Sequence, residues 1–323
     1  MNILVTGGAG YVGAHTVRWL ERHGHTVWVY DNLSRGTRRF VRSERLFEGD
    51  LQDTRRLSDA LQQIRADAVV HCAAFTAVGE SVVQPELYYG NNVVGSWSIL
   101  EAMRTADVRR VVFSSTAAVV GVPERIPITE DLERRPCSPY GRTKAIVEEM
   151  LADYAAAHGF GAIALRYFNA AGASPDGSIG ELHDPETHLI PLLLDVALGR
   201  RPSLTLFGDD YPTPDGTCIR DYIHVDDLAA AHLAALDRLN PGSLAIYNLG
   251  TGRGFSNLEV IAACRRVTGR PIPIALGPRR AGDPPQLVAD PSRAREELGW
   301  TPRYVELEEI VSTAWNWHRT LQD

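Results

Sequence analysis

The sequence predicts an α/β fold in which helices flank a doubly wound, mostly parallel sheet, followed by a smaller mixed α/β domain. Three observations lead to this prediction. Short apolar runs alternate with helical patterns through the first half of the chain, a glycine-rich turn follows the first run, and small or polar residues end several predicted strands. Ligands bind beyond the carboxyl ends of strands in such sheets, so the strand ends also predict where the site lies.

The first predicted strand, Ile3 to Val5, and the turn after it indicate a dinucleotide-binding site of the Rossmann type. In the turn, Gly7, Gly10 and Gly13 permit a tight reversal and close approach of backbone N–H groups to a pyrophosphate. A helical pattern begins at once, and a helix N-terminus favours phosphate.

The second predicted strand, Thr26 to Tyr30, ends in Asp31. An acid at about this distance from the glycines binds the adenosine ribose hydroxyls. A carboxylate there repels a 2′-phosphate, so NAD is favoured over NADP. Arg35 lies in the same loop and keeps NADP open, because an arginine can hold that phosphate.

The remaining elements continue the alternation and then lose it. We expect strands at 45–48, 68–72, 110–114 and 161–166, with helices at 54–64, 88–103 and 139–158. Later we expect one strand at 204–207 and helices at 191–198, 226–238, 257–268 and 306–320. Residues 1–166 would then form the nucleotide-binding domain and 167–323 the substrate domain, with some later segments returning to the first sheet.

The segment Ser138 to Lys144 carries the predicted chemistry. Ser138 is a typical N-cap and Pro139 a typical first helical residue, so Tyr140 and Lys144 project from one face of a helix. A tyrosine has a pKa of about 10, and a nearby cation stabilises its phenolate. The same spacing also occurs by chance on amphipathic helices. Ser114, Ser115 and Thr116 lie at the end of a predicted strand. Their hydroxyl groups either point toward Tyr140 beyond the strand end or cap the backbone.

Composition limits the other classes of function. The 323 residues are 44% hydrophobic and 23% charged, and the net charge of −7 gives no basic surface for nucleic acid. No apolar stretch reaches the roughly 20 residues that cross a bilayer, and the N-terminus does not resemble a signal peptide. The four cysteines show no CxxC and the ten histidines no HExxH. We expect a cytoplasmic protein without a bound metal.

Motifs along nearly the whole chain carry a family resemblance. They are the glycine turn, SerSerThr at 114–116, Tyr140xxxLys144, AlaValGlyGluSer at 77–81, TyrTyrGlyAsnAsnVal at 88–93, ArgTyrPheAsnAlaAlaGly at 166–172, ArgAspTyrIleHisValAspAsp at 220–227 and TyrAsnLeuGlyThrGly at 247–252. In this order they resemble the extended short-chain dehydrogenase/reductase family and, within it, the UDP-glucose 4-epimerases.

The resemblance implies a reaction and roles for three residues. UDP-glucose and UDP-galactose would interconvert as hydride passes from C4 to NAD, the 4-keto sugar turns, and hydride returns to its other face. Tyr140 would be the base and Thr116 would hydrogen-bond the reacting oxygen. Lys144 would lower the pKa of Tyr140 and hold the nicotinamide ribose.

The resemblance also implies the two binding sites. The NAD site would comprise Gly7, Gly10, Tyr11, Val12, Gly13, Asp31, Asn32, Asp50, Leu51, Cys72, Ala73, Ala74, Asn91, Tyr140, Lys144 and Phe168. The UDP-sugar site would comprise Thr116, Asn169, His188, Leu189, Phe207, Arg220, Tyr222, Arg280, Asp283 and Leu287. Core packing is an alternative role for the apolar members. Family members commonly form homodimers through the helices expected at 88–103 and 140–157.

Three departures from the family pattern bear on specificity. Thr76 replaces a frequent lysine, Val120 replaces a tyrosine, and Leu287 stands where a tyrosine narrows the sugar pocket in epimerases restricted to unacetylated hexoses. The smaller leucine predicts some activity on UDP-N-acetylglucosamine.

Other functions remain as alternatives. A 4-epimerase of another UDP-sugar, such as a uronate or pentose, is open. A 4,6-dehydratase needs an acid and a base directly after the threonine, where Ala117 and Ala118 stand. A non-catalytic NAD-binding protein typically loses the tyrosine or lysine, and this chain retains both.

Overall fold

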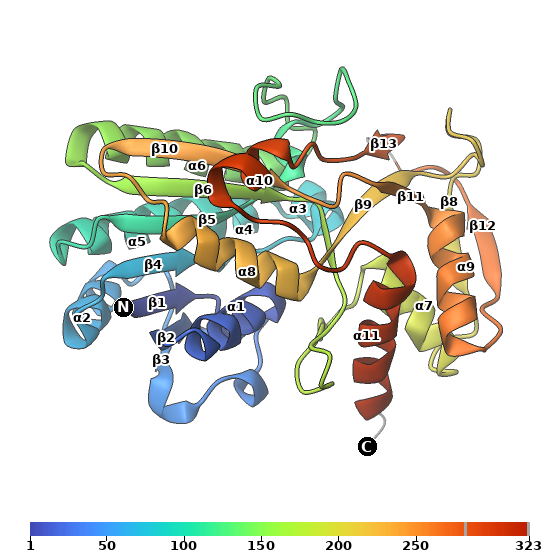
Figure 1. Cartoon of the computed structure of the whole chain (residues 1–323), viewed down its shortest axis with the longest axis horizontal. Coiled ribbons are helices and arrows are strands. Elements are labelled where there is room, and N and C mark those ends of the chain that lie inside the picture. Colours follow the sequence, from blue (N-terminus) through green and yellow to red (C-terminus); the bar gives the residue numbers. More distant parts are fainter. Residues whose placement is uncertain (281–282, 322–323) are drawn as a thin grey trace.

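A seven-stranded parallel sheet organises the larger part of the molecule in the computed structural model, which describes residues 1–280 and 283–321 (Figure 1). Its strand order is β10-β6-β5-β4-β1-β2-β3. The strands are β1 (Asn2–Thr6), β2 (Thr26–Asp31), β3 (Leu46–Glu48), β4 (Ala68–His71), β5 (Arg110–Thr116), β6 (Gly161–Tyr167) and β10 (Ser243–Leu249). The order reverses between β1 and β4, and this switch point adjoins the glycine turn. The predicted fold class is confirmed.

Helices cover both faces of this sheet because its strands are apolar on both sides. Along β1, Ile3 and Val5 belong to one buried cluster and Leu4 to the other. The first cluster is covered by α1 (Tyr11–Arg22) and α8 (Val225–Leu236), which run side by side. The second is covered by α2 (Thr54–Ile64), α5 (Gly95–Thr105) and α6 (Pro139–His158).

A smaller part of the molecule holds two short sheets, seen at the right of Figure 1. One contains β7 (Asn169–Ala171), β9 (Ile219–His224), β11 (Gly254–Ser256) and β13 (Gln286–Leu287), and the other β8 (Leu204–Phe207) and β12 (Ile274–Gly277). Around them lie α7 (Leu189–Ala197), α9 (Asn257–Thr268) and α11 (Leu307–Thr320), which share a third core. Chain segments from this half also join the large sheet, since β10 pairs with β6.

The structure differs from the predicted elements in three respects. Six of its strands, β7 and β9 to β13, were not predicted. The helix expected at 88–103 is divided into α4 (Pro85–Tyr88), a π-helical segment (Tyr89–Val94) and α5. Two short helices were not predicted, α3 (Val78–Val83) and α10 (Ser292–Leu298). Within the described part of the chain, no helix is both long and apolar enough to span a membrane.

Candidate active site

The glycine turn between β1 and α1 brings three chain segments into close contact. Gly7 has φ +70°, and a Cβ there would lie 2.6 Å from the backbone N of Ala73. A Cβ on Gly13 would lie 2.1 Å from the Gly7 carbonyl oxygen. Glycine is therefore required at both positions. The turn packs directly on the CysAlaAla segment after β4, which contains Cys72, Ala73 and Ala74.

The N-terminus of α1 has no side-chain cap. Gly10 is its N-cap and supplies no side chain to the first-turn N–H groups of Tyr11, Val12 and Gly13. Such groups lack acceptors within the helix and attract anions. Tyr11 itself is buried, and its hydroxyl donates to the Gly172 carbonyl at 2.6 Å.

Asp31 ends β2 beside this turn. Its carboxylate accepts the N–H groups of Ala9 at 3.0 Å and Leu33 at 2.8 Å. Burial raises the pKa of Asp31, and these two hydrogen bonds lower it. Asn32 donates to the Asp50 carboxylate at 2.9 Å, so three residues expected in the NAD site lie together at the ends of β2 and β3.

The start of α6 lies against the end of β5. The Ser138 hydroxyl accepts the Gly141 N–H at 3.2 Å, and Pro139 is the first helical residue, as predicted. A Cβ on Gly141 would lie 2.5 Å from the Ala118 carbonyl oxygen. This close approach places Tyr140 beside Thr116, whose hydroxyl also accepts the Ala118 N–H at 3.1 Å.

Burial dominates the electrostatics of the tyrosine and lysine. It raises the pKa of Tyr140 to about 12, opposed by a hydrogen bond with the Thr116 hydroxyl. It lowers the pKa of Lys144 to about 8. The Lys144 ammonium donates to the Ser114 carbonyl at 2.9 Å rather than to the phenol. Burial is thus the largest influence on the pKa of the phenol, and the expectation that Lys144 lowers it stays a prediction.

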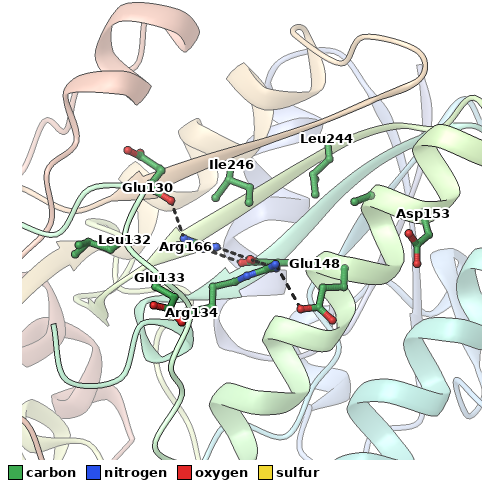
Figure 2. A pocket seen from close by; sticks show the side chains of 11 residues that line it. Glu130, Leu132, Glu133, Arg134, Glu148, Asp153, Arg166, Leu244 and Ile246 are labelled. Atoms are coloured by element: carbon green, nitrogen blue, oxygen red, sulfur yellow. Dashed lines mark hydrogen bonds and ion pairs between the residues drawn. The ribbon is translucent and has the colours of Figure 1, made fainter. Parts of the chain in front are cut away.

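A buried ion pair fixes α6 to the sheet one turn beyond Lys144, and sequence reasoning missed it. Glu148 accepts from the Arg166 guanidinium at 2.5 and 2.8 Å and from the Ser115 hydroxyl at 2.6 Å. Figure 2 shows the pair in a surface pocket that Arg134 also lines. Residues of the predicted site are thus positioned by a charged contact between α6, β5 and β6.

The remaining expected NAD residues have mixed environments. The side-chain amide of Asn92 donates to the Phe75 carbonyl at 3.0 Å and accepts the Phe75 backbone N–H at 2.9 Å. The Asn91 side chain donates to the Asn92 side-chain oxygen at 2.9 Å. The π-helical segment is thereby fixed to the loop after β4. Cys72 accepts a hydrogen bond from Ser114 at 3.2 Å, and Leu51 and Phe168 are buried in apolar clusters.

Most expected UDP-sugar residues gather around β9 and its neighbours. Asn169 pairs with Tyr222 in register, and Leu287 pairs with Arg220. Arg220 forms an ion pair with Asp283. The Arg280 guanidinium lies 4.2 Å from the centroid of the Phe207 ring. These contacts place two guanidinium groups near the ends of the two short sheets.

Two further residues link this group to the rest of the site. His188 is the N-cap of α7 and Leu189 its first residue. Leu287 packs on a buried cluster that includes Ala117 and Phe168, which adjoin Thr116 and Asn169 in the chain. Leu287 therefore links β13 to the chain segments that directly follow Thr116 and directly precede Asn169.

The chain is similar to known proteins along nearly its whole length. The sequence profile of the NAD dependent epimerase/dehydratase family matches residues 3–250. A UDP-glucose 4-epimerase of Halalkalibacterium halodurans is 51% identical over 320 residues, covering 99% of this chain and 96% of that protein. A UDP-glucose 4-epimerase from Brucella ovis, solved in complex with NAD, is 51% identical with a TM-score of 0.94, covering 97% of each chain. A UDP-Glc/GlcNAc 4-epimerase from Campylobacter jejuni is 42% identical with a TM-score of 0.85, covering 99% of each.

Proposed function

The chain belongs to the NAD dependent epimerase/dehydratase family, and from this membership we propose that it interconverts UDP-glucose and UDP-galactose by inverting the sugar C4. The observation that carries the proposal is the junction of α6 and β5. There a tyrosine and a threonine hydroxyl lie together, next to a buried lysine and beyond the ends of parallel strands.

The residues present fit NAD. The uncapped N-terminus of α1 suits its pyrophosphate, and Asp31 suits the adenosine ribose hydroxyls. Arg35, the residue that kept NADP open, pairs with Glu80 at 2.7 Å and lies over the Phe75 ring. Because Glu80 holds the Arg35 guanidinium, that group is occupied where it would otherwise bind a 2′-phosphate. This pairing supports NAD rather than NADP. Asn32, Asp50, Cys72 and Phe168 would line the same groove.

The chain's own groups provide proton transfer and positioning. Bound NAD would accept hydride from C4 and return it to the opposite face of the sugar. Tyr140 takes the proton of the 4-hydroxyl and later gives it back, and Thr116 hydrogen-bonds the reacting oxygen. Because burial raises the pKa of Tyr140 to about 12, its base form requires positive charge, which the chain supplies as Lys144 on the same helix face.

Arginines would hold the UDP diphosphate. A guanidinium group can bind two phosphate oxygens at once. Arg220 lies on β9 opposite Leu287, and Arg280 stacks on the Phe207 ring at the end of β8. His188, Leu189, Asn169, Tyr222 and Asp283 would complete this subsite. Leu287 borders the sugar, and its size supports additional turnover of UDP-N-acetylglucosamine, the activity named for the Campylobacter relative.

The rival functions have less support. Ala117 and Ala118 begin a short 3₁₀ helix after Thr116 and carry no proton donor or acceptor, which disfavours 4,6-dehydration. A purely binding role would not require a buried lysine beside a buried tyrosine. Epimerisation of a UDP-uronate or UDP-pentose is the nearest alternative.

Replacement of the base tests the proposal. Tyr140→Phe should lower kcat for UDP-glucose by at least about 10²-fold, since it removes the proton acceptor. The variant should keep its NAD, measured by release of nucleotide on acid denaturation. Undiminished turnover would contradict the assigned role. The same assay run with UDP-N-acetylglucosamine decides whether Leu287 widens the substrate range.

We also propose a cytoplasmic homodimer. Two large apolar residues, Val94 at the end of the π-helical segment and Trp97 in α5, are about half exposed. The adjacent α6 is tied to α5 by a 2.6 Å hydrogen bond from Tyr154 to Glu101. Large apolar side chains exposed in this way suit contact with a second copy of the chain. The four free cysteines support a reducing compartment.

A further inference from the structure

The loop that precedes α7 gathers four side chains with metal-binding chemistry. Glu181, His183, Glu186 and His188 each offer one ligand atom, and these atoms all lie within 4.8 Å of one another. In the proposed reaction only His188 has an assigned place, at the edge of the UDP-sugar site. The other three are not used by the chemistry at Tyr140.

The spacing of these atoms suits a single cation. Nδ1 of His183 lies 3.1 Å from a Glu181 oxygen and 3.7 Å from a Glu186 oxygen. Nδ1 of His188 is hydrogen-bonded to the same Glu181 oxygen and lies 3.8 Å from Glu186. Metal–ligand bonds of about 2.0–2.2 Å in a tetrahedral zinc site put neighbouring ligand atoms roughly 3.3–3.6 Å apart. Small shifts of the side chains would therefore place all four around one ion.

The surroundings hold this cluster in place and leave one side open. Glu181 is buried, and its carbonyl accepts from the Trp317 indole at 2.8 Å. Glu186 accepts the N–H groups of Thr187 and His188 at 2.7 and 2.8 Å. The His188 side chain is 46% exposed, which gives an ion access from solvent.

We propose that Glu181, His183, Glu186 and His188 bind one divalent transition-metal ion of the zinc type. Two imidazoles and two carboxylates suit Zn²⁺, whereas Mg²⁺ and Ca²⁺ prefer oxygen ligands alone. The four residues form no HExxH motif, so the proposed site departs from the expectation of a protein without a bound metal. It does not depend on the proposed epimerase activity.

Calorimetric titration of ZnCl₂ into the tag-free, chelator-treated protein with its NAD tests the proposal. We expect one ion per chain and no comparable heat with MgCl₂. His183→Gln should weaken binding at least tenfold. His23→Gln, which alters an exposed histidine outside the loop, should bind as the wild type does.

Two results would overturn the proposal. One is the lack of a one-to-one site in the wild-type protein, which does not depend on how any variant folds. The other is unchanged affinity in both His183→Gln and Glu181→Gln, with circular dichroism showing that each variant is folded.

Discussion

The Lys144 ammonium is buried, and burial of its charge lowers the stability of the folded protein. Its side chain lies 4.7 Å from the Phe113 ring centroid and donates to one backbone carbonyl, while burial lowers its pKa from 10.5 to about 8. A shift of this size corresponds to roughly 3 kcal/mol against the charged form. A residue that weakens the fold in this way is typical of a functional site.

Lys144→Met should therefore stabilise the nucleotide-free protein at pH 7, by about 1–3 kcal/mol in urea unfolding, while removing activity. The increase in stability caused by Lys144→Met should depend on pH. The unfolded chain binds more protons than the folded one between the two pKa values, so wild-type stability rises as pH rises from 8 toward 10.5. The difference between variant and wild type should shrink by about 1.4 kcal/mol from pH 7 to pH 9. A difference that stays constant would contradict the assigned burial of charge.

The sequence predicts those site residues whose roles depend on the neighbouring chain. Gly7, Asp31, Tyr140 and Lys144 stand out because a tight turn, a strand end or a helical spacing limits what can occupy them. The pairing of Arg220 with Asp283 joins residues 63 apart in the chain, and only the family resemblance indicated both. The Glu181 cluster depends on a loop conformation that no local rule predicts.

At the scale of elements, the Glu148–Arg166 pair decides how α6 meets the sheet. Both side chains are buried, and Arg134 adds a weaker contact with Glu148 at 3.5 Å. Removing one member of a buried pair leaves the other charge without compensation. The helix that carries Tyr140 and Lys144 is thus fixed by a contact outside the site.

Glu148→Gln should destabilise the protein by about 3–5 kcal/mol, measured by urea unfolding. The matched control is Glu149→Gln, whose side chain is 62% exposed and contacts only Arg134 among the charged groups described; it should change stability by less than about 0.5 kcal/mol. Equal effects of the two variants would show that the buried pair does not anchor α6.

Helices whose ends are marked by capping residues were predicted at their observed bounds. α9 has a capping box of Ser256 with Glu259 and a left-handed Gly269 after it, and α2 begins after the N-cap Asp53. The two-residue β13 exists only through pairing with β9, so its local sequence carries no signal. The π-helical segment was missed because its apolar spacing resembles that of an α-helix.

At the scale of the whole molecule, the exposed apolar face of the α5 segment is the proposed contact with a second copy. Trp97→Glu should give a monomer in light scattering, because a charge there opposes burial against the partner. Leu258→Glu changes a comparably exposed residue on α9 and should remain dimeric. A wild-type protein that is monomeric, or a dimer unaffected by Trp97→Glu, would contradict the proposed interface.

Proton NMR of the protein in D₂O with UDP-glucose, and no added NAD, tests the central proposal most directly. Epimerisation with retained NAD predicts UDP-galactose at a steady ratio to UDP-glucose, with protium kept at C4 because hydride returns to the carbon it left. Deuterium at C4 of the product would contradict hydride return. A lack of UDP-galactose even after NAD is supplied would contradict the proposed function itself.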